Sequence, residues 1–391
     1  MQYDQFKERL ITEIENLAPE VNKLNDQLAD YPELGGEEYN SSKAIADLLA
    51  SHGLQVEKPF AGLPTAFKAS IEGEGDKKIA LLVEYDALPG VGHACGHNVS
   101  GSISLLAGLA FSKVVEAVGG RLDIIGTPDE ESDGGKVIMA EQGIFDDYDL
   151  AMMIHLDSRN RVNSRFLALD GLEFSFAGKA SHAAAAPWDG RNALNGVQLM
   201  FHAVDMLRQH VKDDVRIHGI IAEGGEVCNI VPEKAVAHFF IRSKERDYLD
   251  KIKANVIDCA KGSALATQTE VKINKLCPTL SDLKPNKAGD DLIADCFLEF
   301  GLPDNREEYG SGSSDIGNTS YCCPTLHPRL AITDTGASLH TREFAEFVKG
   351  EPAHRVIHSG AKILSLASLK LFNEPWIAER IRKDFEIPEN R

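Results

Sequence analysis

The sequence predicts an α/β protein, in which a three-layer αβα domain with a mostly parallel sheet is interrupted by an inserted ferredoxin-like α+β domain. Continuous apolar runs such as 79–83 and 122–126 are typical of strands buried on both faces, as in parallel sheets. Stretches with helical periodicity separate these runs along the chain. Residues 172–177 instead alternate apolar and polar side chains, which suits an antiparallel strand with one solvated face.

The first part of the chain is expected to alternate helices and strands. An amphipathic helix is predicted over 3–30 because Phe6, Leu10 and Ile14 recur at helical spacing, and Pro32 ends it. The elements that follow are a helix at 41–52, strands at 66–71 and 79–83, a glycine-rich loop at 90–101, a helix at 102–118, and strands at 122–126 and 149–154.

A second domain is expected to interrupt this pattern. The predicted order is strand, helix, strand, strand, helix, strand, which is the ferredoxin-like arrangement. Its elements cover 172–177, 192–210, 215–222, 235–241, 248–262 and 269–274. The predicted domain bounds are therefore 1–166, 167–277 and 278–391, with the α/β pattern resuming after Pro278 and ending in a helix at 353–372.

Length and composition restrict the class of protein. A chain of 391 residues with 43% hydrophobic and 26% charged residues suits two or three globular domains and excludes a disordered or fibrous protein. The net charge of −19 repels nucleic acids and anionic membranes. Apolar runs stay well short of the roughly 20 residues that cross a bilayer, and the N-terminus does not resemble a secretory signal. The odd count of seven cysteines favours a reducing compartment, so the cytoplasm is the expected location.

The strongest local pattern is a glycine-bounded loop that follows an apolar strand. Residues 81–98 read LLVEYDALPGVGHACGHN and offer Asp86, His93, Cys95 and His97. A thiolate and an imidazole two residues apart can bind one cation from an extended loop, and the glycines permit tight backbone turns. The same residues would also suit a buried cysteine with solvent-facing histidines, so the motif alone leaves both interpretations open.

A second pattern is a run of three carboxylates directly after a buried strand. Residues 126–135 read GTPDEESDGG and place Asp129, Glu130 and Glu131 side by side. Adjacent carboxylates repel each other, so a chain tolerates them on a solvated turn or beside a bound cation. One of them could bind a metal ion while its neighbour takes a proton from water. An acidic surface loop is the alternative.

Two histidines complete the set of candidates. His155 follows the apolar run at 149–154, and His340 precedes Thr341, which is expected to open a helix. Each histidine alone would be an ordinary core or loop residue. Together with the two patterns above, they provide a thiolate, imidazoles and carboxylates near strand ends, where open α/β sheets place their sites. This combination predicts a divalent metal site, with zinc favoured and manganese or cobalt as alternatives.

These stretches, in this order, resemble the metallopeptidase family that includes aminoacylase, carnosinase, succinyl-diaminopimelate desuccinylase and bacterial glutamate carboxypeptidase. The ACGHN block is similar to its amidohydrolase branch, which includes aminobenzoyl-glutamate hydrolase and auxin-conjugate hydrolases. The resemblance extends from PELGGEE at 32–38 to the C-terminal helix. It implies a metal-dependent hydrolase of N-acyl amino acids or small dipeptides, with Glu130 as the general base. It also implies one or two divalent ions, bound by Cys95, His97, Glu131, His155 and His340.

One departure from the family pattern concerns Glu84, Tyr85 and Asp86, where the peptidase members carry His-x-Asp. The resemblance implies that one histidine ligand is missing here. In the amidohydrolase branch, Cys95 and His97 compensate for the same loss. The number of bound ions, one or two, is therefore left open.

The resemblance also implies roles for the inserted domain, which corresponds to the family's lid and dimerisation domain. His182, within GKASHAA, would reach the active site of the partner subunit and polarise the scissile carbonyl. Asn229 and Arg242 would bind the substrate, often at a carboxylate, and Ser314 belongs to a loop that lines the substrate pocket. A loop histidine and a surface arginine are the alternatives for His182 and Arg242. The expected assembly is a homodimer or tetramer that acts on a small molecule.

Two other functions stay open. The same metal site could support hydrolytic deamination of an aromatic amine, which would release ammonia instead of an amino acid. The fold could also serve as a non-catalytic metal-binding protein. The adjacent Glu130 and Glu131 favour catalysis, because a binding protein needs no base.

Overall fold

The computed structural model describes residues 3–307 and 312–386. Contacts divide this part of the chain into two compact units. The larger unit combines two segments, one that ends at Arg165 and one that begins at Leu283. The smaller unit lies between them in the sequence, from Phe166 to Asp282, and also includes Gly312 and Ser313.

The larger unit contains a mostly parallel six-stranded sheet with the strand order β1-β2-β4-β3-β5-β11. The strand β3 is parallel to β4 and β5, and β11 is parallel to β5. Near one edge, β2 runs antiparallel to both of its neighbours, β1 and β4. A separate parallel pair joins β6 and β12. The strands are β1 (Val56–Glu57), β2 (Phe67–Glu72), β3 (Lys78–Val83), β4 (Arg121–Gly126), β5 (Leu150–Met152), β6 (His155–Asp157), β11 (Thr325–Leu326) and β12 (Arg329–Ala331).

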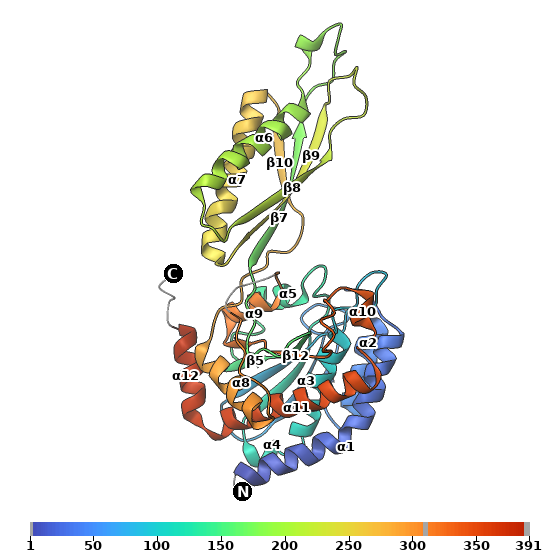
Figure 1. Cartoon of the computed structure of the whole chain (residues 1–391), viewed down its shortest axis with the longest axis vertical. Coiled ribbons are helices and arrows are strands. Elements are labelled where there is room, and N and C mark those ends of the chain that lie inside the picture. Colours follow the sequence, from blue (N-terminus) through green and yellow to red (C-terminus); the bar gives the residue numbers. More distant parts are fainter. Residues whose placement is uncertain (1–2, 308–311, 387–391) are drawn as a thin grey trace. The chain divides into compact units, whose positions relative to one another are not determined.

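Helices from both segments cover this sheet. The helix α3 is buried along its whole length and packs on β3 and β4, and α1 and α11 pack on α3 and on each other (Figure 1). The helices of this unit are α1 (Tyr3–Asp30), α2 (Tyr39–Ser51), α3 (His97–Phe111), α4 (Val115–Val118), α5 (Gly135–Glu141), α8 (Lys287–Glu299), α9 (Ile316–Cys322), α10 (Arg342–Ala345), α11 (Gly350–Asn373) and α12 (Pro375–Glu386). The structure therefore confirms the α/β class predicted from the apolar runs.

The smaller unit is a ferredoxin-like α+β domain, as predicted. Its antiparallel sheet has the order β10-β7-β9-β8, and α6 and α7 pack on this sheet and on each other (Figure 1). Phe174, Phe176 and Phe239 belong to a hydrophobic core of its own. The elements are β7 (Ala168–Ala177), η1 (Pro187–Asp189), α6 (Ala193–Leu207), η2 (Arg208–His210), β8 (Arg216–Glu223), β9 (Lys234–Ser243), α7 (Arg246–Thr267) and β10 (Glu270–Lys275).

The prediction of a helix at 102–118 was wrong at both ends. The helix α3 begins at His97, because Gly96 adopts a left-handed conformation (φ 81°) that turns the chain directly into the helix. It ends at Phe111, and the short helix α4 follows. The histidine predicted to lie in a loop is therefore fixed on the first turn of a buried helix.

The predicted strand at 149–154 ends early, because β5 covers Leu150–Met152 and a break separates it from the next strand, β6. The strand β5 pairs with β3 and β11, whereas His155 begins β6 and pairs with Arg329 of β12. The division arises because Met153 N donates to Leu326 O and His155 N donates to Pro328 O, so the chain follows the second segment of the unit. The predicted end of the fold is also corrected, since α12 follows the long C-terminal helix.

Within residues 3–307 and 312–386, no helix is long and apolar enough to span a membrane.

Candidate metal centre

Five predicted ligands come from five places along the larger unit. Cys95 lies in the loop after β3, His97 begins α3, and Glu131 follows β4. His155 begins β6, and His340 lies in the segment between β12 and α10. The fold brings these residues together, because parallel strands deliver the segments at their carboxyl ends to one edge of a sheet.

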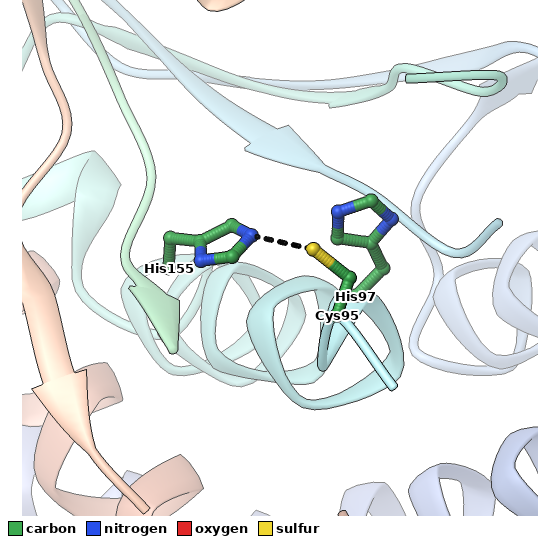
Figure 2. Close-up of side chains that lie close together, drawn as sticks. All are labelled: Cys95, His97 and His155. Carbon is green, nitrogen blue, oxygen red and sulfur yellow. Dashed lines mark hydrogen bonds between the residues drawn. The ribbon is translucent and has the colours of Figure 1, made fainter. Parts of the chain in front are cut away.

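Cys95 is central to the group. Its Sγ is 3.5 Å from His155 Nε2 and 3.3 Å from His340 Nε2. Figure 2 shows the Cys95 sulfur directed toward the ring of His155, with the ring of His97 on the other side. Three sets of donor atoms each lie within 4.8 Å of one another: Cys95, His97 and His155; Cys95, Glu131 and His340; and His97, Glu130 and Glu131.

The backbone around these ligands adopts uncommon conformations. A Cβ on Gly96 would lie 3.1 Å from Leu156 Cβ, so this position favours glycine for space as well as for its positive φ. Asp129 and His340 also have positive φ, 65° and 66°, which is unusual for residues with side chains. His340 N donates to Ala94 O at 2.9 Å, and this bond holds His340 beside the loop that carries Cys95. Such strained backbone is typical of functional sites.

Asp86 connects two of the ligands. Its Oδ1 is 2.8 Å from His97 Nδ1, and its Oδ2 accepts a hydrogen bond from Glu131 N at 2.9 Å. A carboxylate on one ring nitrogen of a histidine keeps the proton there and leaves the other nitrogen free to bind a cation. Asp86 was named among the candidates from the sequence, but this role in orienting the ligands depends on contacts that only the fold creates.

Asp129 lies outside the three donor sets. Its side chain accepts hydrogen bonds from Ser132 Oγ and from Asp133 N, and its own N–H donates to Glu38 Oε1 at 2.8 Å. The first acid of the run therefore stabilises the turn, and the second and third acids reach the cluster.

Comparisons with known proteins identify the family to which the chain belongs. Residues 168–267 match the family described as peptidase dimerisation domain. The chain is 32% identical to the Xaa-Arg dipeptidase of Mus musculus, over 97% of this chain and 92% of that protein. It is 35% identical to a p-aminobenzoyl-glutamate hydrolase protein of Escherichia coli, over 73% of this chain and 63% of that protein. The YXEP protein of Bacillus subtilis, described as a dinuclear metal-binding peptidase of the M20 family, shares the fold with a TM-score of 0.70 and 16% identity, over 92% of this chain and 99% of that one. The chain belongs to the M20 family. As an M20 protein it is a metal-dependent hydrolase of amide or peptide bonds.

The donor atoms of this M20 chain fit a divalent metal ion. His97 Nε2 and Glu131 Oε1 are buried, and neither makes a hydrogen bond of good geometry among residues 3–307 and 312–386. Buried polar atoms without such bonds are rare and call for an explanation such as a bound ion. A set that contains one thiol, three imidazoles and a carboxylate suits zinc or a similar transition metal.

Burial and neighbouring charges separate the two glutamates. Burial, with a further contribution from the nearby carboxylate of Asp315, raises the pKa of Glu130 to about 8. Burial also acts to raise the pKa of Glu131. The close contact with His340 and the charge of His97 outweigh the effect of burial and lower the pKa of Glu131 to about 2. In this contact, His340 Nε2 lies 3.3 Å from Glu131 Oε1. The two adjacent glutamates thus differ in how readily each carries a negative charge.

A second layer of charged residues was not predicted from the sequence. Lys136 Nζ lies 2.6 Å from Glu84 Oε1 and 2.8 Å from Asp315 Oδ1, and all three side chains are buried. The one available signal was the acidic residue Glu84 directly after the apolar strand β3. His327, also missed, stacks on His155 with ring centroids 5.4 Å apart and lies 2.9 Å from Ser164 Oγ through its Nδ1.

The substrate residues suggested by the resemblance are distributed over both units. In the smaller unit, His182 and Asn229 are exposed, and their segments are joined by a hydrogen bond from Ala183 N to Asn229 O at 2.9 Å. Arg242 lies near the other end of β9, where its Nη1 donates to Ser313 Oγ at 2.8 Å. Ser314 belongs to the larger unit and is buried. Part of its loop, 308–311, lies outside the described residues.

Proposed function

We propose that this M20 hydrolase cleaves dipeptides or N-acyl amino acids, with Glu130 as the general base. The observation that carries the proposal is the convergence of Cys95, His97, Glu131, His155 and His340 beside a glutamate whose pKa is raised to about 8. Zinc is the first candidate for the ion, and manganese and cobalt are the alternatives. A divalent ion bound by these residues would polarise the scissile carbonyl and make a nearby water more acidic.

The side chains of the site divide the remaining tasks. Glu130 takes the proton of the attacking water and later returns it to the leaving amine, a role suited to a carboxyl with a pKa near neutrality. Asp86 holds His97 and the backbone of Glu131 in place, so that the geometry is set before the substrate binds.

The substrate class follows from the relatives. One relative is named for Xaa-Arg dipeptides and another for p-aminobenzoyl-glutamate. Both of these substrates carry a free carboxylate next to the amide bond that is cleaved. The relative that covers 97% of this chain makes a dipeptide with a basic C-terminal residue the first choice. The net charge of −19 favours the approach of such a cationic substrate. Arg242 is proposed to bind the carboxylate.

We further propose a homodimer in which His182 and Asn229 act in the site of the partner. The match to the peptidase dimerisation domain supports it. So does the position of the residues: β9 runs from Lys234, near Asn229, to Ser243, and a separation of eight residues along a strand is roughly 26 Å. Arg242 lies at the end of the smaller unit where the chain enters at Phe166, whereas His182 and Asn229 lie at the opposite end.

The state of His182 suits a donor to a developing oxyanion. Its Nδ1 accepts hydrogen bonds from Ala184 N and Ala185 N, at 3.2 Å and 3.1 Å. The proton of the neutral ring is therefore on Nε2, which is free to donate. Removing one such donor commonly slows a reaction by about 10²–10³-fold.

A cytoplasmic location is proposed from the cysteines. All seven are free thiols, as expected in a reducing compartment.

The test is the release of amino acid from Xaa-Arg and Xaa-Lys dipeptides, other dipeptides, N-acyl amino acids and aminobenzoyl-glutamate. The metal-stripped protein is reloaded with zinc, manganese or cobalt and compared with Glu130→Gln, which keeps the shape of the side chain but cannot accept the proton. Metal-dependent release that Glu130→Gln abolishes supports the proposal. Release of ammonia, or no product from the metal-loaded protein, contradicts it and favours deamination or a binding role respectively.

A further inference from the structure

Lys136 is a buried lysine that contacts Glu84, a neighbour of the metal ligand His97. It has no role in the proposed reaction, and its environment is unusual. Lys136 is the second residue of α5, which follows the loop that carries Glu130 and Glu131. Its side chain is completely buried, and a buried ammonium is stable only when carboxylates compensate it. Glu84 and Asp315, which lie in segments far from Lys136 in the sequence, provide this compensation.

Asp315 fixes the lysine at two points. Asp315 Oδ1 accepts from Lys136 Nζ at 2.8 Å, and Asp315 Oδ2 accepts from the backbone N of Lys136 at 2.9 Å. Because both ends of the lysine are bound by one carboxylate, the beginning of α5 and the start of α9 are tied together. The direction of the Lys136 side chain is therefore set independently of any substrate or ion.

Glu84 is fixed by the lysine and faces a metal ligand. Its Oε1 accepts a hydrogen bond from Lys136 Nζ at 2.6 Å. Its Oε2 is buried without a hydrogen-bond partner in residues 3–307 and 312–386, and lies 3.6 Å from His97 Nε2. That nitrogen is the atom of His97 proposed to bind the metal ion, since Asp86 occupies the other one.

We propose that Lys136 is a positioning residue of the metal centre: it holds Glu84 and Asp315 together and so fixes the carboxylate that faces His97. Without the ammonium, two buried carboxylates would face each other, and like charges at such a distance repel. Glu84 would then leave its position, and the negative charge beside His97 Nε2 would no longer favour a cation there. The inference rests on the proposed metal site but not on the proposed reaction.

The test measures metal binding instead of turnover. The full-length protein is stripped of metal and titrated with Co²⁺, whose absorption spectrum reports both the thiolate bond from Cys95 and the geometry of the site. Lys136→Met is expected to weaken Co²⁺ binding about 10–100-fold, as loss of residues that orient metal ligands commonly does, and to change the spectrum.

Lys370→Met is the matched control. Lys370 is a mostly buried lysine of the same unit that pairs with Glu299 at 2.8 Å, near the far end of α11. It is expected to keep the affinity and the spectrum of the wild type. A Lys136→Met protein that binds Co²⁺ as the wild type does, or an equal loss in Lys370→Met, overturns the inference.

A second variant decides if Lys136→Met does not fold. Glu84→Gln keeps the shape of the side chain and an oxygen for Lys136, but removes the charge beside His97. Binding weakened by about tenfold or more supports the inference, and unchanged binding overturns it. A wild-type protein that binds no Co²⁺ would instead refute the metal site itself, and with it the proposed function, so the two failures are distinguishable.

Discussion

The helix α3 and the end of strand β3 approach each other so closely at Gly101 that a side chain there does not fit. A Cβ on Gly101 of α3 would lie 2.1 Å from the backbone O of Glu84, whereas ordinary van der Waals contact begins at 3.4 Å. In Gly101→Ala the helix or the strand end must therefore move by about 1.3 Å, the difference between these two distances. Since the obstacle is backbone, rotation of a side chain cannot relieve it.

This displacement is expected to affect the metal centre as well as stability. His97 lies four residues before Gly101 and so on the same face of α3. Overpacking of this kind commonly lowers the free energy of unfolding by about 1–3 kcal/mol. Movement of His97 away from Cys95 and Glu131 is expected to weaken metal binding about tenfold or more, because ligand geometry must be kept within a few tenths of an ångström.

Two other glycines serve as controls. A Cβ on Gly108, two turns further along α3, would meet the end of the Ile124 side chain, so Gly108→Ala is expected to lower stability but to keep metal affinity. Gly262 lies within α7 with open space around the added carbon, so Gly262→Ala is expected to raise the free energy of unfolding by about 0.5–1 kcal/mol. Urea unfolding and competition with a metal indicator measure both quantities. If Gly101→Ala binds metal within twofold of the wild type, the proposed link between helix packing and ligand position is refuted.

The other predictions use different properties. If His182 acts in trans, mixing Glu130→Gln and His182→Ala subunits should restore about a quarter of wild-type activity, since half of the dimers are mixed and each has one intact site; no recovery after subunit exchange would contradict it. Zn²⁺ at a hundredfold excess over its Kd should stabilise the protein by about 2.7 kcal/mol in a thermal or urea unfolding assay, and a chelator should remove this gain. Asn98→Ala removes hydrogen bonds from its Nδ2 to Asn25 Oδ1 and Val348 O, at 3.0 Å and 2.8 Å, and is expected to lower the free energy of unfolding by about 1–3 kcal/mol in urea. Burial acts to raise the pKa of Asp26, but hydrogen bonds from Gly350 N and His354 hold this pKa below its ordinary value. The ionised carboxylate therefore contributes to stability at neutral pH, and this contribution is lost as the pH falls. The difference in the free energy of unfolding between wild type and Asp26→Asn should vanish well below a pH of about 4.

The sequence predicted those features that depend on local patterns. Apolar runs identified β3 and β4, and alternation identified β7, because burial on one or both faces is visible in a few consecutive residues. The cluster of donor atoms was predicted for a similar reason, since Cys95 and Glu131 follow buried strands and parallel strands end at a common edge.

Features that depend on distant contacts could not be predicted. Lys136 and Asp315 are 179 residues apart, and no local pattern distinguishes this lysine from a surface lysine. The start of α3 was misplaced because Gly96 suggested a flexible loop, whereas its φ of 81° turns the chain directly into the helix. The division between β5 and β6 likewise results from the segment around Leu326 and Pro328, which forms backbone hydrogen bonds with this part of the chain.

The interrupted order of the larger unit has a consequence for its synthesis. The segment that supplies His340 and α11 emerges from the ribosome only after the whole smaller unit, yet α11 packs on both α1 and α3. The smaller unit, with a continuous sequence and its own core, can fold while the earlier part still lacks these neighbours. The nascent protein therefore cannot gather all five ligands until the segment that supplies His340 has emerged, so metal loading follows synthesis of the smaller unit.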